Sequence, residues 1–190
     1  MKNCQYIQYD YSSNRQAIID LFPEVKRCSE APPKAVQHKC NDEYTQIVAD
    51  ILQLQHVERV IFFQMHSDYS SRIHIDGNLK RNLVRTFALN LPLTACNHSW
   101  MRWYKQKPDS ESKYLTEWLE SVVIPLLDRE NAEKISEFSC NKPMIVKIND
   151  WHDIRNTQCE DEFEYYISIR FDSDITVDDV LKMTGSHVLS

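Results

Sequence analysis

His74 and Asp76 are the residues of this chain whose types and spacing most directly suggest chemistry. They stand two positions apart in the segment 72–77, where polar and apolar residues alternate. In an extended strand, residues i and i+2 point to the same face, so the imidazole and the carboxylate would project together. Ile73 and Ile75 would then pack on the other face. The pattern predicts two neighbouring ligands for a metal ion.

A third ligand is available far along the chain in His152, which lies between Trp151 and Asp153. Two histidines and one carboxylate form a facial triad that leaves metal positions open, which suits a non-haem Fe(II) that must bind substrate and O₂. An H-x-D pair alone is common by chance, and a histidine beside acidic residues also suits a surface loop. The metal hypothesis therefore depends on the segments around both motifs.

The segments around the two motifs predict strands in a definite order. Residues 85–93 form a strand that proline ends, and residues 94–104 form a polar turn followed by an aromatic strand. Residues 142–152 lead to the second histidine, and residues 162–171 form a closing strand. The second half of the pattern is thus strand, histidine, acidic loop and strand.

In this order the segments resemble the Fe(II)/2-oxoglutarate-dependent oxygenases, and within them the aspartyl/asparaginyl β-hydroxylase-like and phage-associated members. The resemblance is carried by the H-x-D pair, the A-L-N-L-P-L strand with the cysteine after it, the approach P…V…N…W-H to the second histidine, and the closing S-I-R-F strand. It covers residues 57–171, with an unmatched segment in the middle.

The resemblance implies a chain that is mainly β with flanking helices, folded as a double-stranded β-helix, a cupin-like jelly roll with iron at one open end. His74, Asp76 and His152 would be the iron ligands. In such enzymes 2-oxoglutarate chelates the Fe(II) as cosubstrate, and a basic residue deeper in the barrel holds its far carboxylate. The implied activity is that of a hydroxylase, a dioxygenase whose cofactor chemistry acts on a small molecule or a peptide.

This chain departs from the family where the basic residue is expected, shortly after the second histidine. Glu162 and Glu164 stand there, and a carboxylate would repel the cosubstrate. We predict cosubstrate binding by Arg85, which opens the strand after the metal motif, and secondly by Arg170 with Ser168, which shares its strand face. The alternative for both arginines is a surface charge in an ion pair that stabilises little.

Two other functions fit the same residues. A degenerate jelly roll could keep the metal without turning over 2-oxoglutarate, as the two glutamates suggest. A non-catalytic binding or assembly module could use the fold without a metal, and it would survive replacement of all three ligands.

The composition favours one domain over the whole chain, because 190 residues with 42% hydrophobic residues can bury one sizeable core. A helical N-terminal part is predicted over residues 1–56. Helical apolar spacing places its helices at 14–21 and 42–54, with Asp42 as an N-cap. The jelly-roll core would follow over residues 57–171, beginning with a strand at 57–65.

Two further helical segments are predicted. Residues 110–138 have helical apolar periodicity, with residues such as Tyr114 and Trp118, and Pro125 would end or kink the helix. This segment would be an insert in the core. The short tail 172–190 contains an acid-led amphipathic turn, which predicts one short helix after Ile175.

The overall charge excludes some classes of partner. A formal net charge of −6 argues against a general nucleic-acid binder, which needs a basic surface against phosphates. The six cysteines have no C-x-x-C spacing, no apolar N-terminal signal precedes them, and no run of apolar residues is long enough to span a membrane. We expect a cytoplasmic protein with reduced thiols.

Overall fold

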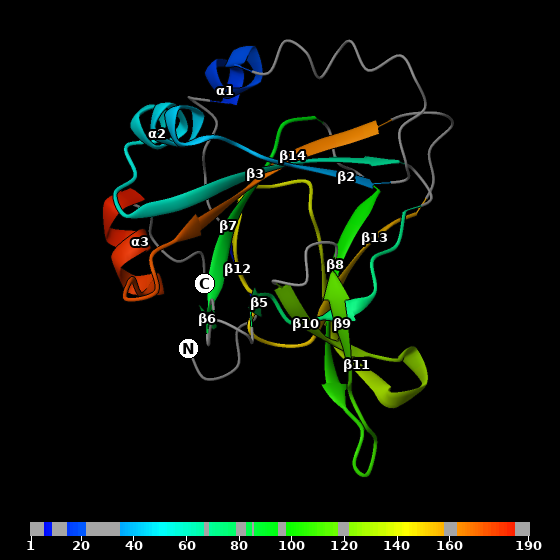
Figure 1. Cartoon of the computed structure of the whole chain (residues 1–190). Coiled ribbons are helices and arrows are strands. Elements are labelled where there is room, and N and C mark those ends of the chain that lie inside the picture. Colours follow the sequence, from blue (N-terminus) through cyan, green and yellow to red (C-terminus); the bar gives the residue numbers. More distant parts are fainter. Residues whose placement is uncertain are drawn as a thin grey trace.

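The computed structural model describes residues 6–8, 15–21, 35–66, 69–78, 83–84, 86–94, 98–117, 122–157 and 163–184. In these residues the chain forms two six-stranded antiparallel sheets and a two-stranded ribbon (Figure 1). The first sheet contains, in spatial order, β1 (Tyr6–Gln8), β12 (Met144–Lys147), β7 (Phe87–Pro92), β14 (Phe163–Phe171), β3 (Val57–His66) and β2 (Ala35–Lys39). The second contains β11 (Ala132–Ser139), β8 (Ser99–Gln106), β13 (His152–Asn156), β4 (Ile73–His74), β10 (Val122–Leu127) and β9 (Lys113–Glu117). The ribbon pairs β5 (Gly77–Asn78) with β6 (Leu83–Val84).

The chain passes between the two sheets in the manner of a jelly roll. From β3 to β4, β7 and β8 it changes sheet at each step, and it does so again from β11 to β12, β13 and β14. The central strands therefore have the order β12-β7-β14-β3 in one sheet and β11-β8-β13-β4 in the other. Two such sheets face to face form a double-stranded β-helix, so the predicted fold is confirmed.

Three α-helices lie together on the outer face of the first sheet (Figure 1). They are α1 (Arg15–Leu21), α2 (Asp42–Ile51) and α3 (Val177–Thr184). The helices predicted in the segments 14–21 and 42–54 and after Ile175 are thus present, although residue 14 lies outside the described residues. Among the described residues, no helix has the length and apolarity that crossing a membrane requires.

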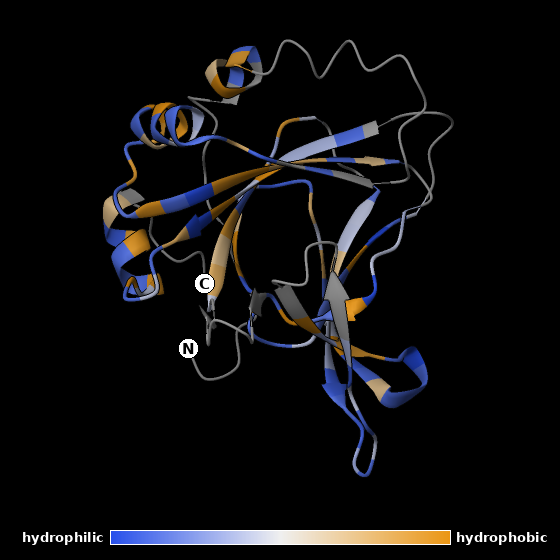
Figure 2. Cartoon of the chain, viewed as in Figure 1, coloured by the Kyte–Doolittle hydropathy of each residue, from blue (hydrophilic) through white to orange (hydrophobic). Residues whose placement is uncertain are grey.

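Alternation along β14 explains why the first sheet is buried on both faces. Ile167 and Ile169 point to the outer face, where they pack in one apolar cluster with residues of the helices. Ser168 and Arg170 point the opposite way and line a cavity between the sheets. The neighbouring strand β7 is mainly hydrophobic (Figure 2), and most of its residues are buried. The helices therefore seal one face, and the other face is left to form a site.

The N-terminal part differs from the prediction in two respects. It is not all helical, because β1 and β2 lie within residues 1–56 and form the two edges of the first sheet. The N-cap of α2 is Asn41 and not Asp42. The Asn41 Oδ1 accepts a hydrogen bond from the Tyr44 N–H at 2.8 Å, and Asp42 instead occupies the first helical turn. Both side chains can cap a helix, so the sequence alone could not separate them.

The prediction of a helical insert at 110–138 was wrong. The described residues of this segment form β9, β10 and β11, with one 3-10 turn at Arg129–Asn131. The run from Val122 to Ile124 is β-branched and is followed by Pro125, which lacks the N–H that a helix interior needs. These residues instead pair with β9, where Pro125 lies opposite Tyr114. Trp118 lies outside the described residues.

Replacing a buried isoleucine of β14 should test the outer core. Ile167 is fully buried in the cluster under the helices, so Ile167→Ala should lower the free energy of unfolding by about 2–5 kcal/mol. Ile135→Ala is the matched control, because Ile135 is 50% exposed on β11 and should change stability by less than about 1 kcal/mol. Urea unfolding measures both, and equal losses would contradict this description of the core.

Candidate metal centre

His74 and Asp76 lie side by side where β4 ends. The Nε2 atom of His74 is 3.1 Å from Oδ1 of Asp76, so the two side chains project together as predicted. The strand itself stops at His74, and backbone hydrogen bonds hold the residues that follow. Ile75 N–H donates to the carbonyl of Pro125 at 3.4 Å, and Asp76 N–H donates to that of Ile148 at 3.0 Å.

His152 reaches the same point from the neighbouring strand. It is the first residue of β13 and lies directly opposite His74 in the antiparallel register. The two imidazole ring centres are 4.5 Å apart, and Nε2 of His152 is 3.9 Å from Oδ1 of Asp76. The possible ligand atoms of all three residues lie within 4.8 Å of one another. The structure thus brings together the three side chains that the sequence singled out.

Backbone carbonyls fix the direction of both imidazole rings. Nδ1 of His74 donates to the carbonyl oxygen of Arg72, and Nδ1 of His152 donates to that of Asp150, each at 2.8 Å. A carbonyl can only accept, so both Nδ1 atoms carry the proton. Each Nε2 is then turned towards Asp76. In metal-binding histidines, a hydrogen bond from the ring nitrogen that does not bind the metal sets the ring orientation and the tautomer. The bond from each Nδ1 to a carbonyl is of this kind.

The surroundings of the site lower the pKa of both Asp76 and His152. Burial alone would raise the pKa of Asp76, but the Arg170 guanidinium and the hydrogen bond with His74 outweigh burial and hold that pKa well below its usual range. Burial and the charge of His74 lower the pKa of His152 to about 4. At neutral pH, Asp76 is therefore ionised and His152 neutral. These are the forms in which a carboxylate and an imidazole bind a metal.

His74 has the opposite shift. Burial would lower its pKa, but the hydrogen bond and the charge of Asp76 outweigh burial and raise that pKa above its ordinary value. The carboxylate of Asp76 therefore favours a positive charge on His74.

Arg170 is the second partner of Asp76. Its Nη2 lies 2.7 Å from Oδ2, the carboxylate oxygen that does not face the histidines. The residue is only 8% exposed, and its Nη1 is buried without a hydrogen-bond partner among the described residues. Ser168, two positions earlier on the same strand face, donates to Oδ1 of Asn90 at 2.5 Å. Arg170 and Ser168 therefore stand beside the three converging side chains, in reach of a common ligand.

All of these residues line one cavity between the two sheets, with a volume of about 630 Å³. The rest of its wall mixes polar with apolar side chains, and the apolar ones include Ile61, Phe63, Met101, Ile124, Leu126 and Ile148. A cavity of this size with a few converging polar groups is typical of a small-molecule site.

The other residues predicted to affect the cosubstrate have different positions. Arg85 and Glu162 lie outside the described residues, so the prediction for Arg85 stays a prediction. Glu164 is buried on β14, where its carboxylate accepts hydrogen bonds from the Ser99 hydroxyl and, at 3.2 Å, from the backbone N–H of His98. The resemblance predicts a cation in this region, but the structure has a carboxylate there that is already hydrogen-bonded.

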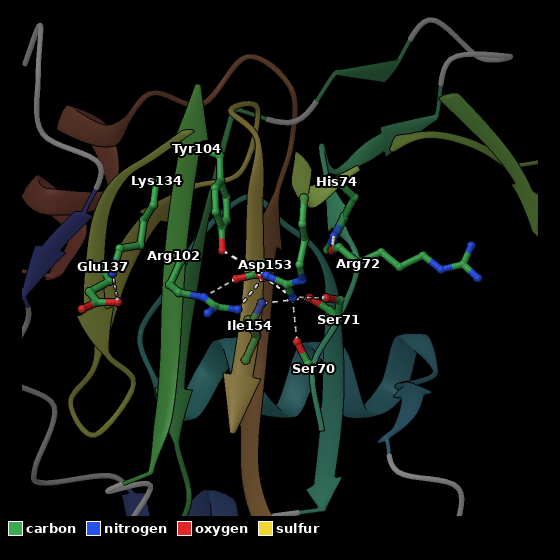
Figure 3. A network of polar contacts seen from close by, with 11 residues as sticks. Ser70, Ser71, Arg72, His74, Arg102, Tyr104, Lys134, Glu137, Asp153 and Ile154 are labelled. Carbon is green, nitrogen blue, oxygen red and sulfur yellow. Dashed lines mark hydrogen bonds and ion pairs between the residues drawn. The ribbon is translucent and has the colours of Figure 1, made fainter. Parts of the chain in front are cut away.

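The sequence interpretation missed a buried ion-pair network on the outer face of the second sheet (Figure 3). Asp153 is fully buried there and receives Nε and Nη2 of Arg102 at 2.7 and 2.6 Å. Nη2 of Arg129 lies 2.8 Å from the same carboxylate, and the Tyr104 hydroxyl donates to it at 3.1 Å. The signal was present in the sequence, because Asp153 follows His152 directly and a strand turns such a neighbour to the opposite face.

The network also joins the two strands that carry the histidines. Arg129 donates to the Ser70 hydroxyl at 2.8 Å, and the Ser71 hydroxyl accepts from Ile154 N–H at 2.8 Å. Ser70 and Ser71 precede β4, whereas Ile154 belongs to β13. The polar contacts outside the sheet thus hold in place the histidines inside it.

The sequence matches no protein-family model and no curated protein. Among solved structures, the chain is similar to a prolyl-4-hydroxylase of Pseudomonas putida (9% identity, TM-score 0.48, over 90% of this chain and 95% of that one). It is also similar to a cupin 2 domain-containing protein of Halorhodospira halophila (11%, 0.36, 83% and 81%). A third is an oxidoreductase of the 2OG-Fe(II) oxygenase family from Burkholderia pseudomallei (10%, 0.34, 87% and 66%).

Removing the buried carboxylate of the network should lower the free energy of unfolding far more than removing an exposed carboxylate. Asp153→Asn keeps the shape of the side chain but leaves Arg102 without its counter-charge, and should lower the free energy of unfolding by about 3–5 kcal/mol. Asp128→Asn is the control. It breaks the exposed pair with Lys113 of the same sheet and should lower the free energy of unfolding by about 0–1 kcal/mol. Similar losses in urea unfolding would mean that the Asp153 network contributes little.

Proposed function

We propose that the chain is a non-haem Fe(II) oxygenase that uses 2-oxoglutarate as cosubstrate and hydroxylates a small molecule or a peptide. The ligands of the iron would be His74, Asp76 and His152. The observation that carries the proposal is the convergence of two oriented Nε2 atoms and one ionised carboxylate at the wall of an open cavity.

The three donors fit a mononuclear metal ion. Nitrogen and oxygen ligands lie about 2.0–2.2 Å from a bound metal, which places adjacent ligands about 3 Å apart. His74 and Asp76 already have this separation, and His152 needs to approach Asp76 by less than 1 Å from its 3.9 Å distance. Two imidazoles and one carboxylate, with room left for other ligands, favour Fe(II) over a closed structural zinc site.

The surroundings of the donors fit an acidic cosubstrate. Nη1 of Arg170 is a buried cationic donor without a hydrogen-bond partner in the described part of the chain, and it belongs to the guanidinium that contacts Asp76. A carboxylate is the partner that satisfies such a donor best. When bound together, Fe(II) and 2-oxoglutarate supply oxidative decarboxylation with O₂ and hydroxylation of a C–H bond. The chain itself would orient the ligands, hold the acid and exclude water with its apolar wall.

A second candidate function is a jelly roll that binds a metal but does not turn over 2-oxoglutarate. The position of Glu164 favours it, because this buried carboxylate occupies the strand position where the resemblance implies a cation. The two functions differ in what the iron-loaded protein does with 2-oxoglutarate.

Loss of either histidine should abolish iron binding. Anaerobic titration of the wild-type chain with Fe(II) should show one ion per chain, and His74→Ala or His152→Ala should weaken binding by at least about 100-fold, since even outer-shell partners contribute 10–100-fold. His98→Ala is the control, because His98 does not line the cavity. Stoichiometric Fe(II) in His74→Ala would show that the ligand assignment is wrong.

Adding 2-oxoglutarate to the anaerobic Fe(II) protein should produce the weak visible charge-transfer band of an iron-chelated 2-oxo acid. The band should be absent in His152→Ala, because the iron is lost. Iron binding without a band in the wild-type chain would instead support the second function, in which the metal is kept and the cosubstrate is not.

A further inference from the structure

We propose that Arg170 binds the metal-side carboxylate of a 2-oxo acid, so that the site accepts 2-oxo acids whether or not they carry a second carboxylate. This inference rests on the proposed metal centre and specifies which part of the acid is recognised. It assigns Arg170 to the carboxylate beside the metal, and it assigns no cation to the far end of the acid.

The first argument is the division of Asp76 between two partners. Oδ1 faces the Nε2 atoms of both histidines, at 3.1 and 3.9 Å, and Oδ2 faces Nη2 of Arg170 at 2.7 Å. A metal bound by Oδ1 would therefore lie about one carboxylate group away from the guanidinium. A ligand on that metal has Arg170 as its immediate neighbour.

The second argument is the unused donor of Arg170. Nη2 is occupied by Asp76, but Nη1 is buried and has no hydrogen-bond partner among the described residues. Leaving a buried donor unpaired is unfavourable, and more so when the donor belongs to a charged group. A carboxylate oxygen coordinated beside Asp76 would satisfy this donor without displacing the existing ion pair.

The third argument is the charge of the remaining cavity wall. Of the described residues that line it, only Arg72 and Arg170 carry a permanent positive charge. Arg72 is exposed, whereas Arg170 is buried. Farther from the metal along β14, the inward-facing residues are Ser168 and then Tyr166, which are both neutral.

The next inward-facing residue of β14 is Glu164, whose carboxylate is buried. A second carboxylate of the ligand in this direction would approach a negative charge and find no cation among the described residues. A terminal methyl group would instead contact apolar wall residues such as Ile61 and Phe63. On the side of β14, the described residues of the wall therefore offer no cation to a second carboxylate.

A matched pair of acids tests this inference directly. 2-Oxoglutarate and 2-oxovalerate have the same five-carbon chain and differ only in the terminal carboxylate or methyl group. Both are titrated anaerobically into the Fe(II)-loaded full chain, and the charge-transfer band is followed. We expect dissociation constants that agree within about threefold, far less than the tenfold that 1.4 kcal/mol of recognition would give.

Arg170→Gln should weaken both acids by the same factor, about 10–100-fold, because a hydrogen bond to a charged group contributes about 1.5–3 kcal/mol. Direct titration should show that Fe(II) still binds. Arg170→Lys should restore part of the affinity, since it keeps the charge and loses the planar fork. Arg155→Gln is the matched control, because Arg155 is exposed on β13 and does not line the cavity, and it should change neither acid.

Several results would overturn the inference. One is tighter binding of 2-oxoglutarate than of 2-oxovalerate by more than about tenfold, which would show a cation at the far carboxylate. Another is loss of acid binding in Arg85→Gln with unchanged binding in Arg170→Gln. A third is iron binding with no band from either acid, which refutes the acid site and leaves the metal centre standing. Absence of iron binding would refute the metal centre and the acid site together.

The comparison of the two acids needs no variant, so it tests the inference even if Arg170→Gln fails to fold.

Discussion

The ion pair between Arg102 and the buried carboxylate of Asp153 fixes the part of the second sheet on which the site depends. Asp153 points outward from β13, and its neighbour His152 points inward. A rotation or shift of this strand would therefore move both. Because Arg102 binds with two nitrogen atoms and Arg129 adds a third contact, the carboxylate can hardly turn. The outer network thus determines where the inner imidazole lies.

In the inner site, charged and polar contacts hold the carboxylate of Asp76. One carboxylate oxygen of Asp76 contacts His74 and the other contacts the guanidinium of Arg170, so attraction from both sides holds the carboxylate. The helices on the outer face of the first sheet make this arrangement possible, because they bury the apolar side chains of β14 and leave the polar ones to the cavity. One strand therefore supplies core on one face and chemistry on the other.

The metal motif could be predicted from the sequence because its signals are local. His74 and Asp76 are two residues apart, and alternation along an extended chain is enough to place them together. The distal His152 could be placed only through the resemblance and its flanking strands. The apolar spacing near Tyr114 predicts a helix, but the β-branched run that ends at Pro125 favours the strand that forms there. The Asp153 network depends on which strands become neighbours, and that information is not local.

The edge strand β11 has a consequence for how the molecule behaves at high concentration. It ends the second sheet, and its register with β8 shifts between Lys134 and Ser136. Glu133, Lys134 and Glu137 on this strand are exposed. An edge that is irregular and charged is a poor template for pairing with the edge of another copy. The strand that ends this sheet thus also discourages the addition of strands from other molecules, and so disfavours β-rich aggregates.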